Sequence, residues 1–293
     1  MTKAPKTGGA KRVEGASMLT PEVVRALISQ LGATRHSDAV DEAQEIMFDA
    51  WECDDPKRRL AMARKALKVS PLCADAYLLL AEETARTEEE ALDLYAKAVD
   101  AGEKALGKAA FEEDAGMFWG LIETRPYMRA RHLLIIAQWR AGRRDDAAAS
   151  AEDMLRLNPN DNQGIRYLLI DWLLRLGRDG DAEKLFKRYK HDCGAEWLWP
   201  ATLAAFRAKG GAAATRTALK QALASNPHVP DYLLGRKKLP RQTPDYISPG
   251  GKDEAVAYVG YGQATWAETP GALVWLDGQV GPPAPRRRAI NRP

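Results

Sequence analysis

Apolar residues recur every three or four positions along most of this chain, and short polar stretches rich in glycine or proline separate the segments. Between residues 39 and 53, for example, Ala43, Ile46, Met47 and Ala50 fall on one face of a helical wheel. This spacing is typical of amphipathic helices, which bury one face against a neighbour. We therefore predict an all-α protein.

The predicted helices come in pairs joined by short turns. The pairs cover residues 39–69, 74–106 and 125–157, and the third of them turns at Gly142 between helices over 125–141 and 144–157. Two further pairs turn at Gly177 and Gly210. Three pairs end in similar phrases, KALKVSP, DMLRLNP and QALASNP, whose prolines stand at 71, 159 and 227. The last two prolines lie 68 residues apart, twice the 34-residue period of the tetratricopeptide (TPR) repeat. We predict a right-handed TPR superhelix of about five helical hairpins over residues 39–227.

One interval breaks this period. The first two prolines are separated by 88 residues, 20 more than two repeats, and we assign the excess to residues 101–123. This insertion contains Phe111, Met117, Phe118 and Trp119. Two interpretations stay open: a small helix that fills one end of the groove, or a gate over a binding surface.

Further elements are expected on both sides of the repeats. Residues 20–38 include a predicted helix from Pro21 to about Leu31, which starts at a Thr-Pro pair. Residues 228–281 predict a C-terminal cap with a short helix over 228–238, an irregular loop over 239–251 and a hairpin over 253–276. A stack of repeats needs such a cap to cover its last hydrophobic face.

Charge is unevenly distributed along the 293 residues, of which 28% are charged, with a net charge of +3. The basic excess lies in two tails, residues 1–19 and 282–293, so the part between them is mildly acidic. Both tails are rich in Gly, Pro and Ala, and we expect them to be disordered. They either solubilise the ends or contact nucleic acid or an acidic partner; nucleic acid is not expected elsewhere.

The remaining composition argues against several other classes of protein. Cys53, Cys73 and Cys193 are widely spaced, which favours a reducing compartment. There is no apolar leader and no long apolar stretch, so we expect a cytoplasmic protein without a membrane segment. Nucleotide-binding and hydrolase motifs are absent, and the four histidines lack metal-ligand spacing. We therefore expect no enzyme activity, no catalytic residues, no metal, no cofactor and no small-molecule substrate.

Several phrases resemble the suppression-of-tumorigenicity-seven family. They are NPHVPDYLL at 226–234, DEAVAY at 253–258 followed by Trp266, and DAYLLLAEE at 75–83. The phrases at 123–131 and 158–164 resemble bacterial repeat-protein relatives of that family, and the resemblance covers most of residues 45–280. It implies a helical repeat scaffold with no established catalysis. The chain lacks the apolar membrane segments of the animal members.

The segment that begins at Glu123 is the richest in candidate binding groups. Arg125, Arg129 and His132 lie three or four residues apart, so they should cluster on one face of the helix that also carries Tyr127 and Arg131. Gln163 and Arg166 open the first helix of the next repeat. In TPR solenoids the first helix of each repeat lines the concave groove.

Guanidinium groups in a groove would bind a peptide carboxylate or acidic side chains in a bidentate manner. We therefore predict that a protein or peptide partner binds there. The predicted partner-binding residues are Arg125, Tyr127, Arg129, His132, Gln163 and Arg166. The alternative is that these arginines pair within the chain with Glu123, Asp161 or the acidic stretch 112–114.

Overall fold

A computed structural model describes residues 37–242, 244 and 246–282, and these residues are all-helical apart from turns and loops. The all-α prediction is confirmed. The tail at 1–19, the helix expected over 21–31 and the tail beyond Pro282 lie outside the described residues. The helices are α2 Asp38–Trp51, α3 Pro56–Val69, α4 Ala74–Thr84, α5 Glu88–Glu113, α6 Arg125–Arg140, α7 Arg144–Leu157, α8 Ile165–Arg175, α9 Asp179–Arg188, α10 Ala195–Lys209, α11 Ala213–Ser225, α12 Val229–Leu233, α13 Lys252–Glu268 and α14 Ala272–Val280.

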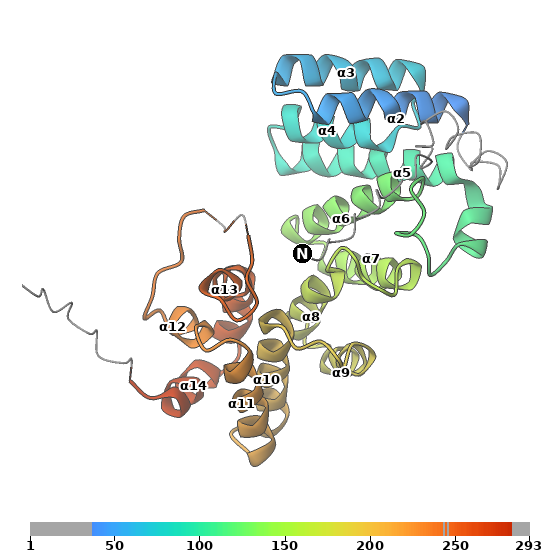
Figure 1. Ribbon diagram of the computed structural model, residues 1–293. Coiled ribbons are helices and arrows are strands. Elements are labelled where there is room, and N and C mark those ends of the chain that lie inside the picture. The colour runs from blue at the N-terminus through green and yellow to red at the C-terminus, as the bar shows by residue number, and fades with distance from the viewer. Residues whose placement is uncertain (1–36, 243, 245, 283–293) are drawn as a thin grey trace, which may run out of the picture.

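Ten of these helices form five hairpins, α2–α3, α4–α5, α6–α7, α8–α9 and α10–α11. The second helix of each hairpin also contacts the first helix of the next, so the hairpins stack in chain order. Figure 1 shows the stack as an arc with α2–α5 at one end and α10–α14 at the other. Each hairpin thus packs mainly on its neighbours, as in a repeat solenoid.

Local signals fix where the helices begin and end. Pro56 opens α3, and the side chain of Asp55 accepts a hydrogen bond from the backbone N–H of Lys57 at 2.9 Å. Gly142 and Gly177 have φ values of 81° and 71°, which allow the chain to leave α6 and α8 in a left-handed turn. The structure therefore confirms the turns predicted at these two positions.

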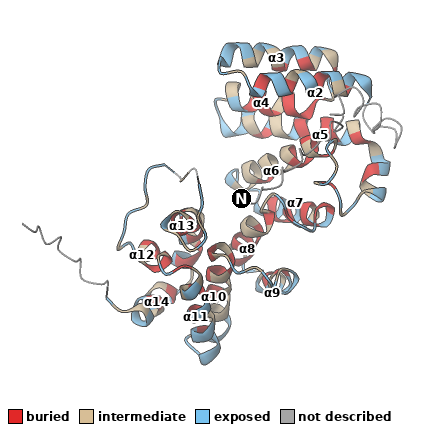
Figure 2. Ribbon diagram, in the orientation of Figure 1, coloured by how far each residue is buried: buried red, intermediate tan, exposed pale blue. Residues whose placement is uncertain are grey.

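The hydrophobic core lies between the helices. Small residues such as Ala43, Ala63 and Ala66 are fully buried between the first hairpins and allow close helix approach. Trp199 and Trp266 fill a larger core around the C-terminal helices. Figure 2 shows this division, with the outer faces of α3, α9 and α11 largely exposed.

The excess residues predicted at 101–123 extend α5 to Glu113 past a break at Gly107 and then return to α6 through turns. The backbone N–H groups of Gly116 and Phe118 both donate to the carbonyl of Leu157, at 3.0 and 3.2 Å. The Phe118 side chain is fully buried. The loop is therefore fixed against the end of α7, and opening it as a gate would expose Phe118.

The C-terminal helices differ in extent from the prediction. The helix expected over 228–238 ends at Leu233, two residues before Gly235, whose φ is 66°. The last helix continues to Val280 instead of ending near 276. Helices α13 and α14 both pack on α10, and α13 also contacts α8.

A buried carboxylate joins this C-terminal part to the last hairpin. Glu254 of α13 accepts hydrogen bonds from the backbone N–H of Ala195 at 3.0 Å, from the amide of Asn226 at 2.9 Å and from the N–H of Gly250 at 2.7 Å. Asn226 and Glu254 come from two of the phrases that carry the family resemblance. Their contact gives both phrases a structural role in holding α13 against α10.

The packing of the inserted loop predicts an unequal effect of two adjacent substitutions. Phe118→Ala should lower the free energy of unfolding by about 3–5 kcal/mol, because it leaves a cavity beside the rings of Phe111 and Tyr127. Met117→Ala should change it by less than about 0.5 kcal/mol, because that side chain is exposed. Urea unfolding of both variants checks this, and equal effects would show that the loop is not packed as described.

Candidate functional site

The first helices of the first three hairpins share a polar network. The side-chain amide of Gln44 on α2 donates to Asp75 Oδ2 on α4 at 2.7 Å. Arg129 on α6 donates to both oxygens of the same carboxylate, with Nε 3.0 Å from Oδ1. The Arg129 guanidinium also lies over the ring of Trp51, 5.2 Å from its centroid. We call the surface formed by α2, α4 and α6 around this network the first-helix face.

The ion pair in this network is part of the fold. The Asp75 side chain is 0% exposed, whereas that of Arg129 is 32% exposed. A buried carboxylate is costly unless charge and hydrogen bonds compensate it, and Arg129 and Gln44 provide both. Arg129 therefore has an intramolecular partner, although not one of those proposed from the sequence.

Arg166 is also neutralised within the chain. Its guanidinium lies 2.8 Å from Asp161 and 2.8 Å from Asp192, and over the ring of Tyr167 at 4.2 Å. Asp161 additionally accepts from the backbone N–H of Ile165 at 2.7 Å, at the start of α8. The pairing of Arg166 with Asp161 is the one named as an alternative from the sequence.

Two further predicted residues bind backbone carbonyls. Arg125 Nε donates to the carbonyl of Trp119 at 3.0 Å, and its guanidinium lies over that ring at 5.6 Å. The side-chain amide of Gln163 donates to the carbonyl of Met128 at 3.1 Å. These contacts fix the inserted loop to α6 and the loop before α8 to α6.

The last two predicted residues are largely enclosed. Tyr127 is buried, and its hydroxyl accepts from Arg131 at 2.7 Å. His132 is partly buried, and this burial lowers its pKa. The six predicted residues thus belong to different contacts, and their cationic groups do not form one free cluster.

The exposed apolar groups of the first-helix face come from α2 and were not predicted. Phe48 and Trp51 are 48% and 40% exposed, and their ring centroids lie 6.1 Å apart. The sequence carried a signal for Phe48, which falls outside the apolar face formed by Ala43, Met47 and Ala50, whereas Trp51, four residues after Met47, lies at the edge of that face. A large aromatic residue off the buried face is the informative exception in an amphipathic helix.

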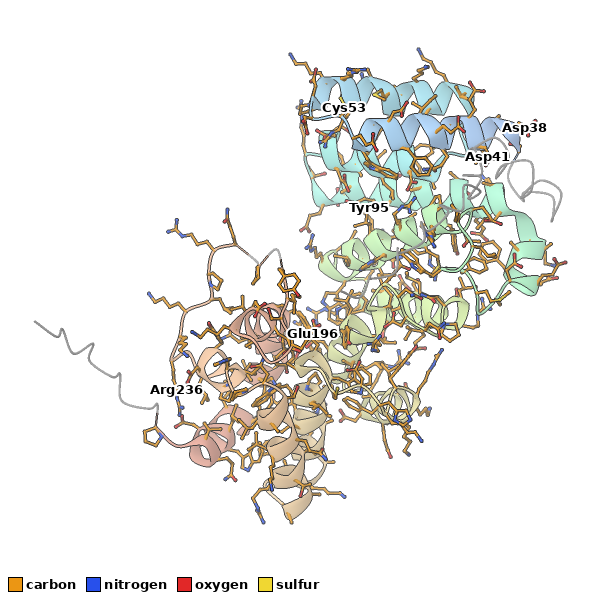
Figure 3. The ribbon with its side chains drawn as sticks, in the orientation of Figure 1. Asp38, Asp41, Cys53, Tyr95, Glu196 and Arg236 are labelled. Atoms are coloured by element: carbon orange, nitrogen blue, oxygen red, sulfur yellow. The ribbon has the colours of Figure 1, made fainter. Side chains whose placement is uncertain are left out.

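Acidic residues surround this aromatic pair. Residues 37–55 contain eight Asp or Glu and no Lys or Arg. Figure 3 shows Asp38 and Asp41 at one end of α2 and Cys53 beyond the other. Glu52 lies four residues after Phe48 and therefore shares its side of the helix.

The equivalent face of α8 and α10 is covered by α13. The Thr265 hydroxyl donates to the buried carboxylate of Asp171, and the Tyr261 hydroxyl donates to Glu196 at 2.9 Å. Arg175 pairs with Glu268 at 3.1 Å. Within the described part of the chain, no helix lies over α2, α4 and α6 as α13 lies over α8 and α10.

A polar cleft of about 690 Å³ opens where α8, α10 and α13 end. Its walls include Arg175 and Arg207, which pair with Glu268 and Asp179.

Among residues 37–242, 244 and 246–282, no group of three His, Cys, Asp or Glu side chains is placed to hold a metal ion. No helix within these residues has the length and apolar character needed to cross a membrane.

Comparison with known proteins identifies relatives of this chain. The family model described as ST7 protein matches residues 30–161 and 205–279. "Protein ST7 homolog" of Drosophila melanogaster is 29% identical over 265 residues, covering 82% of this chain and 49% of that protein. "Suppressor of tumorigenicity 7 protein" of Mus musculus is 28% identical over 286 residues, covering 82% and 49%. The chain spans about half the length of the curated relatives it matches.

A solved structure is also similar. The crystal structure of YrrB, described as a TPR protein with an unusual peptide-binding site, matches with a TM-score of 0.45 and 17% sequence identity. The match covers 69% of this chain and 90% of YrrB.

The Asp75–Arg129 pair predicts a large effect of removing its cation. Arg129→Ala should lower the free energy of unfolding by about 3–5 kcal/mol, because Asp75 would stay buried without a charge partner. Arg140→Ala, at the exposed end of the same helix, is the matched control and should have an effect of less than about 0.5 kcal/mol. Urea unfolding measures both, and similar values would contradict a structural role for the pair.

The buried Asp171 predicts a pH dependence. Burial raises its pKa to about 6, opposed by the hydrogen bond from Thr265 and the charge of Arg175. The folded state therefore holds the proton more tightly than the unfolded state, so this group lowers stability as pH rises from about 4 to about 6. Asp171→Asn should match wild type at pH 4 and be more stable by roughly 2 kcal/mol at pH 8.

The difference between the two unfolding free energies, followed from pH 4 to pH 8, removes the titration of all other groups. A difference that stays constant over this range would contradict the raised pKa.

Proposed function

The chain belongs to the ST7 protein family, and from this premise we propose that it is a non-catalytic scaffold that binds a protein or peptide partner along its first-helix face. The observation that carries the proposal is the exposed pair Phe48 and Trp51. Aromatic side chains bury large apolar areas when a partner covers them and dominate the energy of many interfaces. Two such rings side by side among the exposed residues of an amphipathic helix are typical of an anchor for a partner.

The stacked hairpins suit this role. A helical repeat array presents an extended surface formed by equivalent helices, and such surfaces hold peptides or helices along their length. In this chain Trp51 is held in place by Arg129 from another hairpin. The anchor is therefore fixed before a partner arrives, which reduces the entropic cost of binding.

The absence of catalysis is part of the proposal. It is supported by the roles of the buried carboxylates in the described residues: Asp75 joins three hairpins, Asp171 joins α8 to α13, and Glu254 joins α13 to α10. Each carboxylate accepts hydrogen bonds from the chain itself. Groups with such roles hold helices together and are not available to a substrate.

The proposal predicts that the aromatic pair is required for partner capture. The Phe48→Ala/Trp51→Ala variant should lose the proteins that the wild type captures from cell extract, with little change in unfolding free energy because both rings are substantially exposed. The control is Ile122→Ala/Val274→Ala, which removes two exposed apolar side chains elsewhere on the surface. Retention of the same partners by the Phe48/Trp51 variant would overturn the proposal.

A further inference from the structure

We propose that the segment bound by α2 is a cationic amphipathic helix, with Lys or Arg beside a stripe of apolar residues. This inference rests on the proposed function and specifies the partner chemistry. It starts from the charge of the surface around Phe48 and Trp51. Residues 37–55 carry eight acidic residues and no basic ones.

Part of this negative charge is free to act on a partner. Among the described residues, Asp49 and Glu52 have no ion-pair or hydrogen-bond partner for their side chains, and both residues are exposed. Glu52 lies four residues after Phe48 and shares its side of the helix, and Asp49 lies three residues before Glu52, so both carboxylates belong to the acidic side of α2 that borders Phe48. Charges at the edge of an apolar contact select partners of opposite sign and accelerate their association.

The nearby arginine does not reverse this preference. Arg129 lies over Trp51, but its charge is compensated by the bidentate contact with Asp75. A partner would therefore meet aromatic rings and carboxylates. Guanidinium and ammonium groups bind both kinds of group, through cation–π contacts and ion pairs.

The spacing of the rings favours a helix. The centroids of Phe48 and Trp51 are 6.1 Å apart. Side chains three or four positions apart on a helix are separated by about 5–6 Å, so two such residues of a partner helix can contact one ring each.

The chain contains an internal example of this arrangement. Helix α13 lies against the first helices α8 and α10 and places hydroxyl donors on Asp171 and Glu196. The acidic groups of those first helices are thus satisfied by donors from the covering helix. Asp49 and Glu52 are exposed and hydrated, so a helix that covers them must replace that water with donors, which Lys and Arg supply together with charge.

The test uses two synthetic peptides of about 18 residues, long enough to form a helix in contact with a protein. One has Leu at helical i, i+3, i+4, i+7 spacing and Lys elsewhere; the other has Glu in place of Lys. Binding to the full chain is measured by fluorescence anisotropy. We expect the Leu/Lys peptide to bind and the Leu/Glu peptide not to bind.

Two variants locate the binding. Asp49→Asn/Glu52→Gln should lower the affinity for the Leu/Lys peptide by about threefold to tenfold, and the remaining affinity should depend less on salt. Phe48→Ala/Trp51→Ala should lower the affinity by about tenfold or more. Asp145→Asn/Asp146→Asn removes two exposed acids from α7 and is the matched control, which should bind like wild type.

Three results would overturn the inference: binding of the Leu/Glu peptide, equal effects of the two acid-to-amide variants, or tighter binding when Arg286, Arg287 and Arg288 are changed to Gln. The last result would show that the chain's own basic segment occupies the face. Failure of the proposed function is distinct, since it appears as unchanged capture of cellular partners by the Phe48/Trp51 variant. If that variant loses partners whose binding segments are not cationic, the inference alone fails.

Discussion

A carboxylate that is fully removed from water must be compensated by the groups around it, and Asp75 imposes this requirement on three hairpins at once. Asp75 lies on α4 and accepts hydrogen bonds from the Gln44 amide of α2 and the Arg129 guanidinium of α6. Apolar contacts between neighbouring helices tolerate small shifts, but a bidentate ion pair does not. The network therefore defines how the first three hairpins are placed, and with them the position of Trp51 beneath Arg129.

Buried carboxylates also join neighbouring elements elsewhere along the stack. Asp161 accepts from the start of α8 and pairs with Arg166, Asp171 accepts from α13, and Glu254 accepts from the start of α10. Buried ionic groups often contribute more to the choice of one arrangement than to net stability. In a stack whose interfaces are rich in alanine, such contacts add specificity where side-chain shape adds little. Arg129 and Arg166 are each bound by carboxylates of the chain itself.

Local sequence signals were sufficient for the hairpins. The turn at Gly142 and the helices on either side were predicted to within one residue, since an apolar period and a glycine are both local features. The broken proline interval also located the extension of α5. The pairing of Arg129 with Asp75 could not be predicted in this way, because 54 residues separate them and their contact depends on how α4 and α6 stack.

The candidate site shows the same limit of prediction from sequence. Arginine residues stand out in a sequence because their chemistry suits a ligand, but a sequence does not show which carboxylates already bind them. Phe48 and Trp51 stood out less, although the position of Phe48 off the apolar face of α2 was visible. In a helical repeat, a large apolar residue that departs from the pattern of its own helix is a second kind of signal, beside suitable chemistry, for a candidate surface.

The first helices of the hairpins fall into two groups, one covered by a further helix of the chain and one that no described helix covers. Over α8 and α10 the chain supplies α13, whose Tyr258 and Trp266 are buried in a common core with Trp199. Over α2 and α4 no described helix plays this role, and Phe48 and Trp51 keep substantial exposure. Because α13 buries aromatic residues and donates to acids of the first helices, the covered part shows which chemistry this kind of surface accepts. The uncovered part carries the same two features, aromatic rings and carboxylates, which is why we propose that a partner binds there.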